Sequence, residues 1–262
     1  MLRGFFNRIV FKGSVQWVKR YLTTYEQLIS CDYCRRIRSN WSRGVWYIYG
    51  LFHKIARLMR YEANFVKVKQ MNKMRVLVVD FYDSFVFNLV HYFESFGCQV
   101  EVISDAEINI NELDFLNGFQ GITLSPGPGL PQETRSMMAI IAYCRGRIPV
   151  LGVCLGMQGL GIDLGGTLYN LASIRHGVSQ TMFKQKDGVL LCDLPNQIEV
   201  GLYHSWAIKE IDPNLITAID ADGVLMAIEN PITKQFGVQF HPESVMTAKG
   251  MEIVRNVLSK IF

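Results

Sequence analysis

Residues 149–164 read PVLGVCLGMQGLGIDL, and this stretch decides the fold class. Its first five residues are apolar, as in a short buried strand, and a helical segment follows directly after Cys154. Gly152 and Gly156 flank that cysteine at two residues' distance on either side. They permit a tight strand-to-helix turn, because a Cβ at either position would collide with the crowded neighbouring strands. The stretch therefore predicts an α/β fold in which Cys154 stands above the carboxyl ends of parallel strands, where open α/β sheets bind ligands.

The residues before this turn repeat the same alternation of strand and helix. Apolar runs at 75–80, 99–103 and 121–124 predict three strands, and residues 84–96 and 134–145 predict two helices. Ser84 is the expected N-cap of the first helix. This order is typical of an open, mostly parallel twisted sheet of flavodoxin-like type, with helices on both faces and right-handed crossovers.

After Gly166 the pattern changes to short strands, which predict a small antiparallel sheet beside the parallel one. A helix over residues 248–261 is expected to close the chain. The predicted short strands cover residues 167–170, 179–183, 188–191, 198–203, 224–229 and 236–240.

Charge divides the chain of 262 residues into two parts. Residues 1–73 carry 15 Lys and Arg against three acids, whereas the remainder carries 12 Lys and Arg against 20 acids. We therefore place a boundary near residues 71–74, between a basic, aromatic extension over 1–73 and a globular domain over 74–262. The extension has three interpretations: upstream sequence absent from the working protein, a transit or membrane-surface peptide with an amphipathic helix at 45–58, or an accessory domain.

The six cysteines show no disulfide framework, so a reducing, cytoplasmic location is expected. A plastid or another organelle is the alternative if residues 1–73 are a transit peptide. Cys31 and Cys34 form a CxxC pair with no second pair after it, which does not favour a zinc site. We expect no metal in this chain, no nucleic-acid partner, and no membrane partner for residues 74–262, since no uncharged apolar run approaches roughly 20 residues.

Cys154 is the candidate nucleophile. A cysteine at a helix N-terminus faces the positive end of the helix dipole and unpaired N–H groups, which favour the reactive thiolate. The N–H of Leu155 is placed to donate to an oxyanion on an attacked carbonyl. The alternative is a buried small hydrophobe, which is the interpretation given to Cys98, Cys144 and Cys192.

His241 is the candidate base, and Glu243 the group that orients it. His241 follows the apolar run FGVQF, so it lies at the same rim of the sheet as Cys154. Pro242 holds it extended, and in an extended stretch residues i and i+2 lie on one side. Glu243 can then accept a hydrogen bond from one ring nitrogen while the other faces the thiol. A surface His-Pro turn is the alternative, and His204 is a weaker candidate base.

The loop SPGPGLP, residues 125–131, follows the third predicted strand at the same rim. Gly127 and Gly129 allow its backbone to approach a ligand closely and to complete an oxyanion hole. A plain tight turn is the alternative. The loop is not a phosphate-binding loop, because the Gly-Lys-Ser/Thr ending is missing.

These residues occur in motifs that resemble the class I glutamine amidotransferases, most closely the small subunits of anthranilate synthase and aminodeoxychorismate synthase. The resemblance spans residues 74–262 in family order, with VDFYDSFVFNL, SPGPGLP, GVCLGMQ, HGVSQ, YHSW and FGVQFHPESVMT. It implies that Cys154 attacks the side-chain amide of L-glutamine, that His241 protonates the departing ammonia, and that Glu243 orients His241. It also implies a set of residues that bind glutamine or its oxyanion: Gly127, Pro128, Gly129, Leu155, Gln158, Ser205 and Trp206.

The resemblance further implies a separate chorismate-binding synthase subunit that receives the ammonia and holds magnesium, with no cofactor in this chain. Residues 82–85 and 176–179 would lie near that partner. Met157, Val178 and Trp206 depart from the residues common in the family, and Arg135 stands where glycine is common. The alternatives are a γ-glutamyl hydrolase or peptidase on the same fold, and a non-catalytic binding subunit.

Overall fold

The computed structural model describes residues 74–262, in which nine strands form one sheet in the order β2-β1-β3-β4-β9-β8-β7-β5-β6. The predictions for residues 1–73, including the helix at 45–58 and the Cys31–Cys34 pair, lie outside the described residues. Within the part of the chain that is described, no helix is both long enough and apolar enough to cross a bilayer.

One half of the sheet is parallel, as the sequence predicted. Its five strands pair in the order β2-β1-β3-β4-β9. They are β1 (Arg75–Asp80), β2 (Gln99–Ser104), β3 (Gly121–Leu124), β4 (Val150–Val153) and β9 (Gln235–Val238). Because all five run the same way, the residues that follow β3, β4 and β9 emerge at one edge of the sheet.

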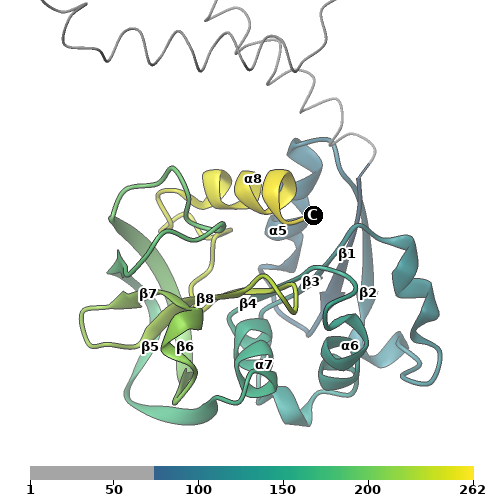
Figure 1. Cartoon of the computed structure of the whole chain (residues 1–262), viewed down its shortest axis with the longest axis horizontal. Helices are drawn as coiled ribbons and strands as arrows, with labels where there is room; N and C mark the ends of the chain where they lie inside the picture. Colours follow the sequence, from purple (N-terminus) through teal and green to yellow (C-terminus); the bar gives the residue numbers. More distant parts are fainter. Residues whose placement is uncertain (1–73) are drawn as a thin grey trace, which may run out of the picture. The chain divides into compact units, whose positions relative to one another are not determined.

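The parallel half is buried on both faces, which explains its continuous apolar strands. In β1, Val76 and Val78 pack into one core, whereas Leu77 and Val79 pack into the other. Helices α5 (Val86–Ser95) and α8 (Gly250–Lys260) contribute to the first core, and α6 (Met137–Cys144) and α7 (Leu155–Asp163) to the second. Figure 1 shows these two pairs of helices on opposite faces of the sheet.

The antiparallel half continues the same sheet, because β8 pairs antiparallel with β9. Beyond it the order is β7, β5 and β6, all joined by antiparallel pairing. Its strands are β8 (Leu225–Asn230), β7 (Ile216–Asp220), β5 (Thr167–Lys184) and β6 (Gln197–Lys209). Short 3-10 helices occur at Asp105–Glu107, Leu113–Gly118, Pro131–Glu133 and Pro213–Leu215.

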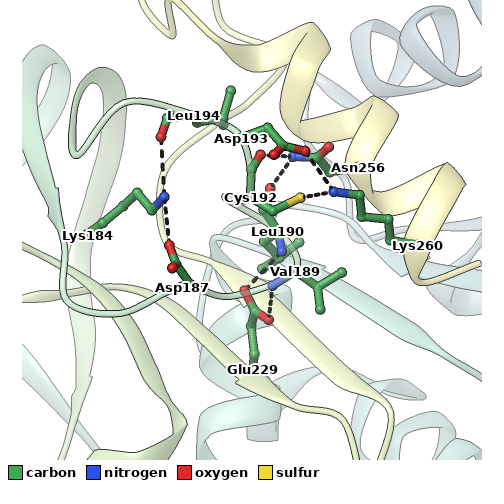
Figure 2. Close-up of polar contacts among 10 residues, drawn as sticks. All are labelled: Lys184, Asp187, Val189, Leu190, Cys192, Asp193, Leu194, Glu229, Asn256 and Lys260. Atoms are coloured by element: carbon green, nitrogen blue, oxygen red, sulfur yellow. Dashed lines mark hydrogen bonds and ion pairs between the residues drawn. The ribbon is translucent and has the colours of Figure 1, made fainter. Parts of the chain in front are cut away.

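The predicted strand at 188–191 is wrong, since these residues form a turn. The Glu229 carboxylate accepts hydrogen bonds from the backbone N–H groups of Val189 (2.7 Å) and Leu190 (3.0 Å). The side chain of Asn256, on α8, donates to the carbonyls of Leu190 and Cys192, both at 3.0 Å (Figure 2). These side chains take the backbone groups that a neighbouring strand would otherwise use.

Three further differences concern the strands β5 and β7 and the start of α5. The predicted strands at 167–170 and 179–183 are parts of the single long strand β5, while β7 was not predicted at all. Ser84 does not cap α5, whose N-cap is Phe85 without a side-chain hydrogen bond. Asp83 provides the local turn instead, since its Oδ1 accepts from the Phe85 N–H at 2.7 Å.

Candidate functional site

Cys154 occupies the sharp turn between β4 and α7 that the two glycines predicted. Its φ of 52° lies in the left-handed region, where a residue with a side chain is strained. A Cβ on Gly152 would lie 2.4 Å from the carbonyl carbon of Gly156, and one on Gly156 would lie 2.4 Å from the Leu124 oxygen. Only glycine fits at either position, so the backbone holds the Cys154 side chain at the carboxyl edge of the parallel strands.

His241 and Glu243 lie in the turn that follows β9, beside that edge. Nδ1 of His241 is 2.7 Å from the Glu243 carboxylate, and both residues are almost fully buried, at 1% and 2% exposure. The backbone of His241 is fixed twice, because its N–H donates to the Gly201 carbonyl (3.0 Å) and its carbonyl accepts from the Thr247 hydroxyl (2.6 Å). The two side chains therefore meet as predicted, but through a turn and not through the extended stretch expected, since the Ser244 N–H donates to the His241 carbonyl at 3.1 Å.

The remaining ring nitrogen of His241 is available to Cys154. Nε2 is buried and makes no hydrogen bond of regular geometry with the described residues, yet the ring is close enough to the thiol for their charges to interact. Burial alone lowers the pKa of a histidine, but Cys154 and Glu243 outweigh it and raise the pKa of His241 to about 10. The site thus favours an imidazolium beside the sulfur at neutral pH.

A cavity of about 210 Å³ opens next to Cys154. It brings together all seven residues that the sequence resemblance assigned to substrate, from three separate parts of the chain: Gly127, Pro128, Gly129, Leu155, Gln158, Ser205 and Trp206. Gly127 must be glycine, because a Cβ there would lie 2.4 Å from the Phe81 oxygen. Leu155 is the first residue of α7, so its N–H has no partner within the helix.

Tyr203 and His204 also line the cavity, although neither was assigned to it from the sequence. Burial, the largest influence, lowers the pKa of His204 to about 4, so the ring is neutral near pH 7. A neutral ring beside the Trp206 carbonyl, 2.9 Å from Nδ1, donates its proton to that oxygen. His204 is therefore held in place by its own strand, and its Nε2 makes no hydrogen bond with the described residues. Both residues belong to the YHSW motif, in which His204 was considered only as a weaker candidate base and Tyr203 was given no role.

Residues near the predicted partner surface meet at the Tyr203 ring. The rings of Phe85 and His176 contact the Tyr203 ring, with distances between ring centroids of 5.1 Å and 5.6 Å. The centroid of the Tyr203 ring is in turn 4.8 Å from that of His241. Tyr82 and Val178, from the same two segments, are exposed. The fold thus joins residues 82–85 and 176–179 into one region beside His241.

Met157 does not line the cavity. Its side chain is fully buried in the core between α7 and the sheet, within reach of Gly237 on β9. Among the described residues, no group of three or more His, Cys, Asp or Glu side chains is arranged to hold a metal ion.

Comparison with known proteins places this chain in one family. A family model described as glutamine amidotransferase class-I matches residues 77–261. The Pseudomonas aeruginosa anthranilate synthase component 2, pyocyanine specific, is 37% identical over 188 residues, covering 71% of this chain and 93% of that protein. The Streptomyces griseus aminodeoxychorismate synthase is 42% identical over 188 residues, covering 70% of this chain and 25% of that protein.

The fold agrees with a solved structure as well. A glutamine amidotransferase from Thermotoga maritima superimposes with a TM-score of 0.57 at 19% identity, covering 69% of this chain and 80% of that one. At that identity the likeness concerns the fold alone, whereas the family model covers most of the chain. The chain belongs to the class-I glutamine amidotransferases.

Proposed function

We propose that this enzyme hydrolyses L-glutamine through Cys154, His241 and Glu243 and supplies ammonia to a chorismate-binding synthase subunit, as component 2 of an anthranilate synthase. The observation that carries the proposal is the buried Glu243–His241 pair beside a cysteine that lines a cavity. The cavity is lined by the residues that the family resemblance assigns to glutamine.

In the first half of the reaction, the Cys154 thiolate attacks the side-chain carbonyl carbon of glutamine. The carbonyl oxygen gains negative charge, and the free N–H of Leu155 together with the backbone of residues 127–129 is placed to stabilise it. The His241 imidazolium donates its Nε2 proton to the amide nitrogen, which leaves as ammonia. The products of this step are a glutamyl thioester on Cys154 and a neutral His241.

In the second half, neutral His241 takes a proton from a water molecule as that water attacks the thioester. The tetrahedral intermediate then collapses, the sulfur departs as thiolate, and glutamate is released. His241 is again an imidazolium, as it was before the first half of the reaction. Glu243 stabilises this charged form of the ring throughout, through its hydrogen bond to Nδ1.

The region around Tyr203 supports the partner proposal. Residues 82–85 and 176–179 meet there, next to His241, with Tyr82 59% and Val178 41% exposed. A subunit that docks on this region would lie beside the base and near the site of ammonia release. We propose that this surface receives the synthase subunit, and that magnesium belongs to that subunit and not to this chain.

Three substitutions relative to the family pattern affect this proposal unequally. Met157 lies in the core, so it leaves hydrolysis intact. Trp206 lines the cavity and Val178 lies on the proposed partner surface, so they alter the fit of glutamine and the coupling to the synthase, respectively.

Aminodeoxychorismate synthase is the second candidate pathway, and the 42% identity to the Streptomyces griseus protein favours it. The two candidates share the glutamine reaction and differ in the product made by the large subunit. Co-purification of the native chain with its large subunit, followed by identification of the product from chorismate, distinguishes anthranilate from aminodeoxychorismate.

The glutaminase proposal is tested with Cys154→Ala in complex with that large subunit. We expect glutamine-dependent product formation to be lost while formation from added ammonium salts is retained, because only the ammonia source is removed. Undiminished use of glutamine by the Cys154→Ala complex would refute the assignment of the nucleophile. Cleavage of γ-glutamyl peptides in preference to glutamine would instead favour a γ-glutamyl hydrolase.

A further inference from the structure

Gln239 contacts the sulfur of Cys154, although nothing in the sequence motifs singled it out. Parallel pairing of β4 with β9 sets Val153 opposite Val238, so the next residues along both strands, Cys154 and Gln239, emerge side by side. Gln239 is completely buried, and its Nε2 donates a hydrogen bond to Sγ of Cys154 at 3.5 Å. The contact therefore follows from the strand register, not from the orientation of a flexible surface side chain.

A second glutamine fixes which end of the Gln239 amide faces the sulfur. Nε2 of Gln158, on α7, lies 3.3 Å from Oε1 of Gln239 and 2.8 Å from the Trp206 carbonyl. Because Oε1 of Gln239 accepts from Gln158, the NH₂ group must point toward Cys154. The amide is thus held as a donor to the sulfur.

A purely structural role would look different, and the same strand provides an example. Gln235, at the other end of β9, is also buried, at 1% exposure, and its amide is bonded at one end to Asp163 (2.7 Å) and at the other to the Thr233 hydroxyl (2.6 Å). Gln239 instead directs its donor to the reacting atom. A buried amide N–H is a poor match for a neutral thiol, which accepts weakly, and a good match for a thiolate.

We propose that Gln239 is a catalytic residue, whose side-chain amide stabilises the Cys154 thiolate and fixes the direction in which the sulfur points. This role rests on the proposed glutaminase function and deepens it. The hydrogen bond is strongest when the sulfur is charged, as it is when Cys154 attacks and again when the thioester breaks. Gln239 therefore favours formation of the attacking thiolate and its departure in the second half of the reaction.

The test measures the rate at which iodoacetamide alkylates Cys154 as a function of pH, with the site mapped by mass spectrometry. In Gln239→Met, which keeps the length but lacks the donor, we expect the midpoint of the acid limb to move to higher pH. Alkylation below the wild-type midpoint should slow by about tenfold or more, the ratio that corresponds to losing one hydrogen bond to a charged group. The plateau rate at high pH should not fall, because a thiolate without this donor is at least as nucleophilic.

Gln239→Asn is the second variant, because its amide is one methylene too short to reach the sulfur. Thermal unfolding identifies which variants are folded, and either folded variant decides the question. Gln235→Met is the matched control: it removes a buried amide from the same strand and should lower stability while leaving the pH profile of Cys154 unchanged. A wild-type acid limb in folded Gln239→Met or Gln239→Asn would overturn the proposal, as would an equal displacement in Gln235→Met.

Alkylation by iodoacetamide does not require glutamine turnover, so this result is independent of the proposed reaction. If the Gln239 variants displace the acid limb of the alkylation profile but the wild-type chain fails to hydrolyse glutamine, only the glutaminase assignment is refuted. If the Gln239 variants keep the wild-type acid limb and the wild-type chain hydrolyses glutamine, only the role of Gln239 is refuted.

Discussion

Glu243→Gln is the substitution whose effect follows most directly from the geometry. The Glu243 carboxylate lies 2.7 Å from Nδ1 of His241, and its second oxygen, Oε2, is buried with no hydrogen-bond partner among the described residues. The negative charge is therefore stabilised mainly by the ring. Replacing it with a neutral amide removes a charge-assisted hydrogen bond, which contributes about 1.5–3 kcal/mol. If the transition state loses all of this stabilisation, kcat/KM for glutamine falls by about 10- to 150-fold.

The same substitution should also shift the pH profile of kcat/KM, and the direction of the shift follows from the charges. Cys154 and Glu243 outweigh burial and raise the pKa of His241, so the imidazolium persists to about pH 10 in the wild type. Removing the Glu243 charge lowers the pKa of His241, so the imidazolium, which in the proposed reaction protonates the departing ammonia, is lost at a lower pH. The basic limb of the kcat/KM profile should move to lower pH.

The assay is the pH profile of glutamate release by the full chain in complex with its large subunit. Glu229→Gln is the matched control, since Glu229 is also buried, at 5% exposure, but binds the backbone of Val189 and Leu190. It should lower stability and leave the profile in place. If Glu243→Gln retained wild-type kcat/KM and an unmoved basic limb, Glu243 would have no role in orienting or charging His241.

Three further predictions concern stability and thiol reactivity. Gly156→Ala places a Cβ 2.4 Å from the Leu124 oxygen, so the free energy of unfolding measured with denaturant should fall by about 1–3 kcal/mol. An unchanged free energy of unfolding would show that the turn is looser than described. Arg175→Met leaves the buried carboxylate of Asp220 without its ion pair, so the free energy of unfolding should fall by about 3–5 kcal/mol in the same measurement. A fall of less than about 1 kcal/mol would mean that the pair is open to water. When Cys154 is first blocked with a chloroketone analogue of glutamine, alkylation mapped by mass spectrometry should modify Cys192 before Cys98 and Cys144, because Cys192 is half-exposed whereas burial raises the pKa of the other two to about 11 and 12. Early modification of either buried thiol would contradict this order.

The parallel half of the fold, the turn at Cys154 and the contact between His241 and Glu243 were predictable because their signals are local. β1 and β3 begin and end where the apolar runs do, and Gly152 and Gly156 mark the turn at Cys154 without knowledge of the rest of the chain. The contact between His241 and Glu243 was also predictable, because the two residues are only two positions apart, although the backbone there is a turn that Gly201 and Thr247 help to hold.

The features that were missed depend on contacts between distant residues. Residues 188–191 have the composition of a strand, but the Glu229 carboxylate binds the backbone N–H groups that a strand would offer to its neighbour. Gln239 was missed for a related reason. Within FGVQF it resembles an ordinary strand residue, and only the register of β9 against β4 brings its amide to the sulfur.

The most direct test of the central claim is covalent trapping at Cys154. The purified full chain is treated with the chloroketone analogue of glutamine, with and without excess glutamine, and the adduct is mapped by mass spectrometry. We predict one adduct, on Cys154, that excess glutamine suppresses and that Cys154→Ala abolishes. An adduct on another residue, or none on a folded chain that still hydrolyses glutamine, would contradict the account.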